Sequence, residues 1–397
     1  MTTETSTYDL VAMRQQLPAL NDIVYMNSGT EGIMAEPVKQ KFFETLGRFE
    51  SYGHWGRVEL NDQMGLCRQR VATMINAESD EVTITRNGTD GVSIVLGSFP
   101  LQTGDEIIIG SEEHPAIVYP AFSLQTVRGI VVKRFRFEHD PAQTFANFTS
   151  LLTERTKLVA FSHVSCETGT RNPAKQIIDA AHAAGVPVLL DGAQTFGAIP
   201  VDFKALNCDY FTGSAHKWLC GPKGTGILAV RRDRLDSLTP AYIGGGSLAD
   251  GFPWTDLDDP ASVRTAFAPS ASKFEYGMRN PAVYAGMTYA IDYLTEIGWE
   301  AIAAHERLMS DRLKSRLAEV PGARLQTPIP WENSSPILNI AIDGVTGKEL
   351  SQRLWNDYKI VQRAVRDPDG VRISNAYWTT NEDHDKLIDA MVTIGKR

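Results

Sequence analysis

A lysine between a serine, a histidine and a glycine-rich turn is the densest chemical signal in the sequence. Lys217 stands in SAHKWLCGPKGTG, residues 214–226, just after the strand-like run CDYFTG. A lysine at a strand end can be partly desolvated, and its amine is then nucleophilic enough to form a Schiff base. Ser214 and His216 could bind an anion, and the glycines allow close approach of the backbone. A solvated loop lysine is the alternative that the motif alone leaves open.

An acidic residue closes an apolar strand earlier in the chain. The run VPVLL leads directly into Asp191-Gly192-Ala193-Gln194. A carboxylate at the end of a buried strand is costly unless it meets a cation, and a protonated pyridine nitrogen is such a partner. Asp191 could equally cap a helix or bind a metal, and Gln194 could make an ordinary polar contact.

The elements that must position these residues alternate between strand and helix from about Glu106 to Val230. The apolar runs are EIIIG, GIVVKRFRF, KLVAFSH, VPVLLDGA, CDYFTGSA and TGILAV, and AKQIIDAAHAA is helix-like. This βαβ-like order predicts a mostly parallel sheet covered on both faces, with a site at the carboxyl ends of its strands. The fold class is therefore α/β.

Two helices are expected upstream of this pattern, over residues 60–75 and 89–96. The second would be entered through the turn Asn87-Gly88. A helix N-terminus at Gly88 and Thr89 has free backbone amides that attract an anion, although such a turn is often only a cap.

After Val230 the pattern changes. The loop-rich stretch GGGSLADGFPWTDLDDPAS is too long for a simple connection and predicts a lid or a partner contact. Long helices are expected over residues 283–297 and 299–318, followed by the strand PILNIAI, a helix over 348–355, the strand VRIS and a helix over 384–394. We therefore expect a large domain over residues 25–279, a small α+β domain over 280–397, and an N-terminal segment, 1–24, associated with the small domain.

The composition of the chain limits the classes of partner that it could bind. The chain has 397 residues, a formal net charge of −9 and scattered basic residues, which disfavours nucleic acid and suits a small polar substrate. No stretch approaches membrane-spanning length, so we expect a cytoplasmic protein. The four cysteines follow no metal-ligand spacing; we expect reduced thiols and no metal site.

These motifs together carry a family resemblance. DGAQ, SxHKW and GPKGTG resemble the cysteine-desulfurase-like, class V aminotransferase group of fold-type I enzymes that use pyridoxal 5'-phosphate (PLP). The resemblance runs from YMNSGTEGI at Tyr25 to VRIS at Val371, and it is strongest to the cysteine/cystine C-S lyase branch, followed by isopenicillin N epimerase-like proteins. It implies PLP as cofactor and a homodimer with active sites at the subunit boundary.

The resemblance also assigns cofactor contacts. It implies that Lys217 carries PLP as an imine, that Asp191 pairs with the pyridine nitrogen and that Gln194 contacts the phenolic oxygen. His114, in EEHPAIV, would stack on the ring and assist proton transfer. The phosphate ligands would be Ser214, His216, Gly88 and Thr89.

Two arginines are implied as substrate ligands. Arg372, in VRIS, matches the family arginine that binds the α-carboxylate, a task that suits a planar guanidinium. The stretch QRAVRDPDGVRIS resembles the lyase branch and makes Arg363 a second candidate, although it could also be a surface residue.

Three positions depart from the family pattern. Glu167 stands where an asparagine is usual beside the ring, and it could repel a carboxylate, act as an extra base or face away. Met278 replaces the threonine of FExGT that reaches a neighbouring subunit's phosphate. Ala376 replaces the histidine of RISxH. These changes bear on the substrate more than on the cofactor.

The reaction is then narrowed by chemistry. Elimination and epimerisation share removal of the α-proton by Lys217, and they part according to whether the β-carbon carries a leaving group. Desulfuration needs a thiolate in the C-terminal part, and no cysteine follows Cys220 unless Cys166 substitutes. A relative without cofactor is disfavoured because the cofactor residues are present. We therefore predict a C-S β-lyase on cysteine, cystine or an S-substituted cysteine, with an epimerase or aminotransferase as the alternative and a desulfurase disfavoured.

Overall fold

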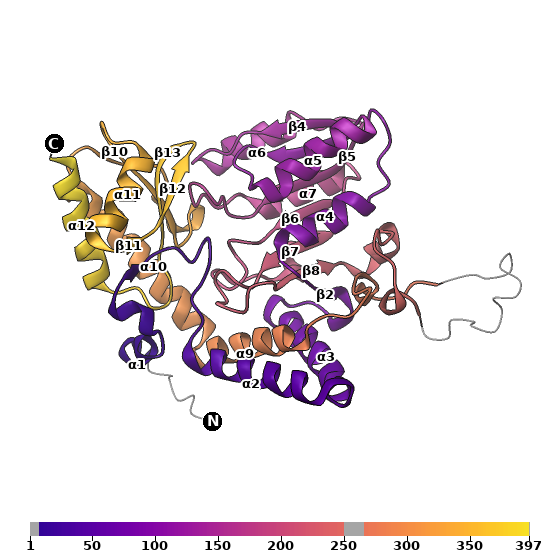
Figure 1. Ribbon diagram of the computed structural model, residues 1–397. Coiled ribbons are helices and arrows are strands. Elements are labelled where there is room, and N and C mark those ends of the chain that lie inside the picture. The colour runs from indigo at the N-terminus through magenta and orange to yellow at the C-terminus, as the bar shows by residue number, and fades with distance from the viewer. Residues whose placement is uncertain (1–7, 250–265, 397) are drawn as a thin grey trace, which may run out of the picture.

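A seven-stranded sheet, a four-stranded sheet and a two-stranded sheet, with the helices around them, form the fold in the described residues. Figure 1 shows a computed structural model of the chain, which describes residues 8–249 and 266–396. The large sheet has the strand order β2-β8-β7-β6-β5-β3-β4. Its strands are β2 (Val82–Thr85), β3 (Glu106–Gly110), β4 (Val131–Phe135), β5 (Thr156–Ser162), β6 (Val188–Asp191), β7 (Tyr210–Ser214) and β8 (Gly226–Val230).

The predicted mostly parallel sheet is confirmed, and only β8 breaks the pattern among these seven strands, since it pairs antiparallel with both β7 and β2. The reason is the short connection between β7 and β8, which holds no crossover helix and so cannot return the chain for a parallel pairing. Lys217 lies in this connection. The mostly parallel sheet thus has one reversed strand, joined to β7 by the segment that carries Lys217.

Helices cover both faces of the large sheet because its strands are apolar on both sides. Ile107 and Ile109 of β3 pack in one cluster with α4 (Gly88–Ser98) and α5 (Pro115–Arg128), whereas Ile108 packs in another cluster with α7 (Ala174–Ala183). This is the two-residue alternation of a strand. The remaining helices before the small sheet are α1 (Leu10–Gln15), α2 (Glu36–Tyr52), α3 (Gly56–Ile75), α6 (Pro141–Thr149), α8 (Phe203–Leu206), α9 (Pro281–Ile297) and α10 (Trp299–Arg316).

The C-terminal sheet is antiparallel, with the order β12-β13-β10-β9. Its strands are β9 (Ala323–Leu325), β10 (Ile337–Ile342), β12 (Arg363–Arg366) and β13 (Asp369–Ser374), packed with α11 (Gly347–Tyr358) and α12 (Asn381–Gly395). β12 is an edge strand, and this edge carries Arg363. The neighbouring strand β13 lies inside the sheet and carries Arg372. Arg363 therefore lies at the sheet edge, whereas Arg372 lies in the interior.

The N-terminal segment contacts the C-terminal part of the chain. β1 (Val24–Tyr25) pairs in parallel with β11 (Ile360–Val361), and Arg14 forms an ion pair with Asp383 at 2.7 Å. Figure 1 shows α9 beside α2 and α3, below the large sheet, where these helices contact one another. The domain limits at residues 24 and 279 stay a prediction.

The predicted loop after β8 is described only in part. The loop-rich stretch at residues 244–262 begins with the 3-10 turn Gly245–Ser247, and its residues 250–262 lie outside the described residues. In the described ranges, no helix is both long and apolar enough to cross a membrane.

Candidate active site

Most of the predicted cofactor residues meet at one edge of the large sheet. Asp191 ends β6, Ser214 ends β7 and His114 follows β3, because the carboxyl ends of parallel strands share one edge. They border a cavity of about 240 Å³. Of the residues singled out in the sequence, those lining it are Gly88, Thr89, His114, Asp191, Ser214, His216, Lys217 and Arg363.

Lys217 and Asp191 are buried in this cavity as a mutually stabilising pair of charges. Their exposed fractions are 9% and 3%. Burial lowers the pKa of Lys217, and the nearby Asp191 opposes that shift. Burial raises the pKa of Asp191, opposed by Lys217 and by the backbone N–H of Ala193, which donates to Asp191 Oδ1 at 2.8 Å. A desolvated lysine beside an acid is the setting that imine chemistry requires.

An anion would fit at the start of α4. Asn87 caps this helix by accepting from Asp90 N at 2.9 Å, and Gly88 N donates to Ser214 Oγ at 3.1 Å. A Cβ at Gly88 would lie 3.0 Å from Ser214 Oγ, so a side chain would crowd the cradle. His216 Nδ1 is buried and has no hydrogen-bond partner within the described residues. Helix amides, a hydroxyl and an unsatisfied imidazole nitrogen together suit a phosphate group.

His114 borders the cavity in a fixed orientation. It is the N-cap of α5, and its Nδ1 accepts from Ala116 N at 3.1 Å. Burial, followed by the cations Lys217, Arg363 and Arg372, lowers the pKa of His114 to about 4. The ring is therefore neutral near pH 7, and its Nδ1 acts as an acceptor, which leaves the proton on Nε2.

The amide of Gln194 is held in one orientation from both ends. Its Nε2 donates to Gly29 O at 2.9 Å, and its Oε1 accepts from Trp218 Nε1 at 2.9 Å. The remaining N–H of Nε2 is the group it can offer to a cofactor oxygen. Gly29 and Trp218 were not among the predicted site residues, although they stand in the motifs YMNSGTEGI and SAHKW.

Arg372 is completely buried, and within the described residues it has no carboxylate partner. Its Nη1 donates to Cys166 O at 2.9 Å, and its Nη2 donates to Asn27 Oδ1 at 3.1 Å and to Thr30 Oγ1. Its Nε has no partner in the described chain. Burial, then the cation Arg363, lowers its pKa to about 10. Asn27 and Thr30 stand in the motif YMNSGTEGI, so the signal for them was present in the sequence.

Arg363 differs from Arg372 because it already has an acidic partner. Arg363 Nη2 pairs with Glu167 Oε1 at 2.9 Å, and the two side chains are 34% and 17% exposed. The sequence leaves Arg363 as either a second carboxylate ligand or a surface residue, and it leaves Glu167 to repel a carboxylate, act as an extra base or face away. The structure instead joins them, so neither is free until the pair opens.

Glu113, the residue before His114 in the chain, is a buried acid that the sequence motifs did not single out. Glu113 accepts from Ser162 N at 2.9 Å and from Ser162 Oγ at 2.6 Å. Ser162 is paired with Asp191 across β5 and β6. Burial, opposed by the Ser162 hydrogen bonds, raises the pKa of Glu113 to about 8, so this carboxyl is mostly protonated at neutral pH. The pair of acids in SEEHP was the available signal.

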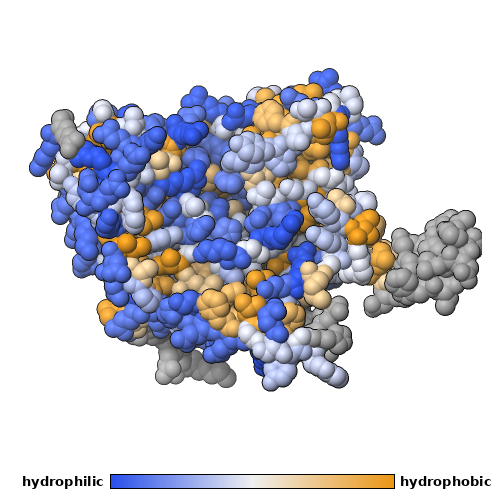
Figure 2. Space-filling view, viewed as in Figure 1, coloured by the Kyte–Doolittle hydropathy of each residue, from blue (hydrophilic) through white to orange (hydrophobic). Residues whose placement is uncertain are grey.

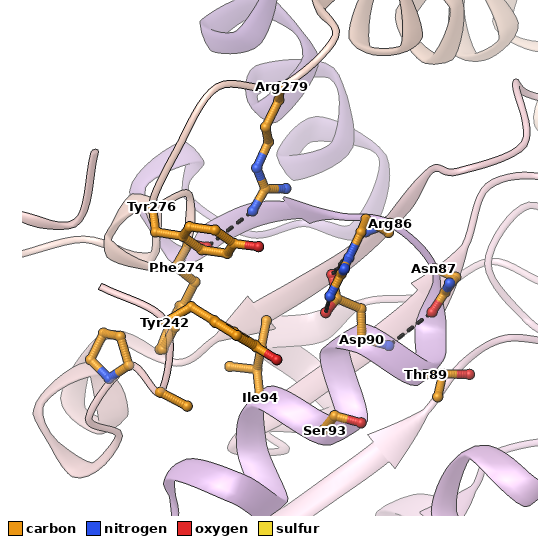
Figure 3. Close-up of a pocket in the computed structure, with 12 residues that line it drawn as sticks. Arg86, Asn87, Thr89, Asp90, Ser93, Ile94, Tyr242, Phe274, Tyr276 and Arg279 are labelled. Atoms are coloured by element: carbon orange, nitrogen blue, oxygen red, sulfur yellow. Dashed lines mark hydrogen bonds and ion pairs between the residues drawn. The ribbon is translucent and has the colours of Figure 1, made fainter. Parts of the chain in front are cut away.

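The other two departures lie apart from these contacts. Met278 is 72% exposed, whereas Ala376 is buried and its N–H donates to Thr379 Oγ1 at 2.9 Å. A second cavity of about 480 Å³ borders the start of α4, where it shares Asn87 and Thr89 with the first. Figure 3 shows Tyr242, Tyr276 and Arg279 around this second cavity.

The fold and these residues define an enzyme that holds PLP at the carboxyl edge of a fold-type I sheet. The chain belongs to the class V aminotransferase family, whose sequence profile, described as aminotransferase class V, matches residues 36–384. Lys217, Asp191 and the anion cradle fit the reactive carbonyl, the basic ring nitrogen and the phosphate of that cofactor.

Two curated relatives illustrate the range of activities. A cysteine desulfurase from Synechococcus elongatus is 34% identical over 74% of this chain, which spans 46% of that relative's own length. Isopenicillin N epimerase from Streptomyces clavuligerus is 28% identical over 93% of this chain and 94% of its own. The resemblance to both groups predicted from the motifs is confirmed.

Two solved structures of one protein, C-DES, share the fold. In one, a variant carries glycine covalently linked to its PLP cofactor; it superposes with a TM-score of 0.87 at 26% identity, covering 96% of this chain and 98% of its own. In the other, described as a cystine C-S lyase, C-DES holds its reaction product cysteine persulfide; the TM-score is 0.86 at 26% identity, with 95% and 99% covered.

Proposed function

We propose that the protein is a C-S β-lyase acting on cysteine, cystine or an S-substituted cysteine. Resemblance to the cystine C-S lyase C-DES supports a lyase. The observation that carries the choice against sulfur transfer is the burial of every thiol in the chain. All four cysteines lie in the described residues, at exposed fractions of 0–4%, and burial raises the pKa of each thiol.

A persulfide carrier needs an accessible thiolate to take sulfur from the substrate and pass it on. Two cysteines lie beside the site: Cys220 Sγ donates to Lys217 O at 3.6 Å, and burial raises the pKa of that thiol. The other is Cys166, whose carbonyl oxygen accepts from Arg372. Burial raises the pKa of its thiol to about 12, so it is protonated at neutral pH. A buried thiol of this kind does not support the desulfurase alternative.

Lys217 lines the cavity, and Arg372 lies behind Thr30, a lining residue to which its Nη2 donates. These positions support a proton-transfer role for Lys217 and a binding role for Arg372. Arg372, with no acid of its own, would receive the α-carboxylate, and Lys217 Nζ would take the α-proton. PLP, when bound, supplies an acceptor for the electron pair left on the α-carbon, and Asp191 would keep a proton on its ring nitrogen. That electron pair then forms the Cα–Cβ double bond as the Cβ–S bond breaks, and the two electrons of the Cβ–S bond leave with the sulfur. Hydrolysis of the remaining fragment gives pyruvate and ammonia.

Assays on sulfur amino acids test this proposal. The purified protein should release pyruvate and ammonia from at least one of cysteine, cystine and S-methylcysteine. A variant in which all four cysteines are replaced by serine or alanine should keep that activity, whereas a desulfurase would lose sulfur transfer to an acceptor. Absence of pyruvate from all three substrates rejects the lyase. Exchange of α-hydrogen with inversion and no product would then identify an epimerase, which the relative from Streptomyces clavuligerus makes the next candidate.

We also propose a homodimer in the cytoplasm. The second cavity lies beside the phosphate cradle, and exposed apolar side chains stand around the segment that borders it: Tyr242, Ile243 and Met278 are 63%, 58% and 72% exposed. Figure 2 shows hydrophobic residues at the right-hand edge of the molecule, over residues 231–249. Burial of such a surface by a second copy would place a subunit boundary next to the cofactor phosphate.

A further inference from the structure

Arg363 stands at the boundary between the cofactor cavity and a larger cavity of about 1100 Å³. It borders both spaces, whereas Glu167, among the residues that the structure describes, borders the larger one alone. A substrate side chain that leaves the cofactor cavity on this side passes the guanidinium of Arg363. What that side chain meets depends on Glu167, whose Oε1 accepts from Arg363 Nη2 at 2.9 Å.

The carboxylate of Glu167 is held in place by its own turn. Glu167 N donates to Ser165 Oγ at 3.1 Å, and Cys166 Sγ donates to Glu167 Oε1 at 3.4 Å, the same oxygen that accepts from Arg363. Ser165 Oγ in turn donates to Glu112, which follows β3. The ion pair is therefore organised before a ligand arrives. A ligand carboxylate must displace Glu167 from Arg363 or meet an arginine whose charge is already neutralised.

The charges around the cofactor cavity leave one cation for a substrate. Asp191 opposes the charge of Lys217, and Glu167 opposes that of Arg363. Among residues 8–249 and 266–396, Arg372 has no acidic partner, since its hydrogen bonds go to a backbone carbonyl, an amide oxygen and a hydroxyl. One α-carboxylate satisfies Arg372. A second carboxylate, on the side chain of the substrate, finds no unpaired cation among these residues, and desolvating it without one is unfavourable.

We propose that Glu167 is a specificity-determining residue that selects against amino acids with an acidic side chain. It does so by neutralising Arg363 at the boundary of the two cavities. Glu167 does not border the space that holds the reacting atoms, so it acts through Arg363 and not as an extra base. The inference deepens the proposed function and rests on it only for the substrate class, a cysteine derivative whose side chain carries no net charge.

Glutamate and glutamine are the probes for this selection. They have the same shape and differ by one negative charge on the side chain, and neither carries a leaving group on the β-carbon. Their binding to the PLP-loaded protein can be followed by the change of its visible absorption band. The ratio of the two dissociation constants isolates the charge of the side chain, because effects on cofactor content and on the α-carboxylate are common to both ligands.

The parent protein should bind glutamine at least as tightly as glutamate. Glu167→Gln should shift the ratio toward glutamate by about tenfold or more, the factor that corresponds to about 1.4 kcal/mol, because Arg363 is released to the ligand carboxylate. In the double variant Glu167→Gln, Arg363→Ala this gain should disappear. A parent protein that prefers glutamate overturns the proposal, and so does an unchanged ratio in Glu167→Gln.

Glu138→Gln is the matched control. Glu138 borders the same larger cavity, but it pairs with Arg136 at 3.0 Å, so the substitution makes the same change of charge away from Arg363. The ratio should stay at the value of the parent protein. An equal shift in Glu138→Gln would assign the selection to the overall charge of the cavity. A gain that persists in the double variant would place the ligand carboxylate away from Arg363. Either result overturns the role of Glu167.

The outcome for binding is separate from the outcome for chemistry. If no sulfur amino acid releases pyruvate but the ratio shifts toward glutamate in Glu167→Gln, the proposed lyase is wrong and the role of Glu167 stands. If pyruvate is released and the ratio is the same in the parent protein and in Glu167→Gln, the lyase stands and the role of Glu167 is wrong.

Discussion

At the scale of single residues, burial sets the protonation of the groups around the cofactor cavity. Asp191 is 3% exposed, and its cationic neighbour Lys217 keeps its carboxylate form from being prohibitively costly. A ring nitrogen that shared a proton with Asp191 would stay positively charged. We therefore expect the electron-accepting capacity of the cofactor to depend on this one carboxylate.

Replacing Asp191 should separate cofactor attachment from turnover. We predict that Asp191→Ala lowers kcat by about 10²–10³-fold, the usual loss when one electrostatic stabiliser is removed. Borohydride reduction and peptide mapping should still place the cofactor on Lys217. Asp191→Glu, the control, should retain more activity. A turnover number near that of the unmodified enzyme would contradict the assigned role.

The two arginines should respond differently to removal. Arg372→Ala should raise the half-saturating substrate concentration strongly, by a factor that corresponds to about 2–5 kcal/mol of binding free energy. The reason is that the substrate's buried carboxylate would lose its partner. Arg363→Ala should do less, since Arg363 is already neutralised by Glu167. Steady-state kinetics on both variants, with cofactor content checked by absorbance, measures the difference. An equal effect of the two substitutions would place both arginines on the substrate.

The buried carboxyl of Glu113 should give stability a pH dependence. Burial raises its pKa to about 8 from the model-compound value of 4.5, so between these values the folded state holds a proton that the unfolded state releases. Its contribution to stability is therefore full below about pH 4.5 and falls as the pH rises toward about 8, by up to about 1.4 kcal/mol per pH unit.

Glu113→Gln removes this titration, so the variant should gain stability relative to the parent as the pH rises through that window. Urea unfolding at about pH 5 and about pH 8 measures the change. A difference in unfolding free energy between parent and variant that is the same at both pH values would show that Glu113 ionises normally.

At the scale of elements, the phosphate cradle depends on how closely α4 lies on β7. A Cβ at Gly91 would stand 2.2 Å from Thr212 Oγ1 and 3.2 Å from Ile227 O. The absence of a side chain at this position lets the first turn of α4 approach Ser214, to which Gly88 N donates. The helix packing therefore sets the cradle.

Gly91→Ala should move α4 away from the sheet. We predict a loss of about 1–3 kcal/mol in unfolding free energy, as for other overpacked cores, together with weaker binding of the cofactor. Gly97→Ala on the same helix is the control, since a Cβ there meets nothing within 4 Å and should stabilise the helix slightly. Cofactor binding by absorbance titration and thermal unfolding test both. If both variants lost the same unfolding free energy and the same affinity for the cofactor, the packing of α4 on the sheet would not be the cause of the loss.

At the scale of the whole molecule, aromatic and arginine side chains gather at the cavity beside the phosphate cradle. Tyr242 and Tyr276 stack at 5.2 Å, and Arg279 lies over Tyr276 at 5.8 Å. Such aromatic and arginine side chains are typical of interface centres. We expect sedimentation equilibrium to give twice the mass of one chain.

A charged substitution should weaken that association. Ile243→Glu places a carboxylate on an exposed apolar position, and we predict a shift toward monomer with loss of activity in proportion. Val127→Glu, at an exposed apolar position on α5, is the control and should leave the mass unchanged. A fully active, PLP-saturated monomer of the parent protein would refute the dimer.

The sequence by itself determined the chemical core of the protein. The apolar runs placed β3, β5, β6, β7, β8 and β10 close to their observed limits, because buried strands must be apolar along their whole length. Their ends then brought Asp191, Ser214 and Lys217 to one cavity. Local pattern did not predict α5, whose run contains Pro115 and Pro120. Tertiary packing overrides this weak helical preference.

Only the tertiary structure decided how distant charges pair. Arg363 and Glu167 are 196 residues apart in the chain, and their ion pair exists because the edge strand β12 lies against the end of the large sheet. The same approach of the C-terminal sheet to the large sheet encloses a cavity of about 1100 Å³. It also leaves Arg372 buried, with no acidic partner among residues 8–249 and 266–396. Residue types and spacing encode what a strand or helix can carry. Which charges become partners depends on long-range packing, so the pairing cannot be predicted from a local sequence pattern.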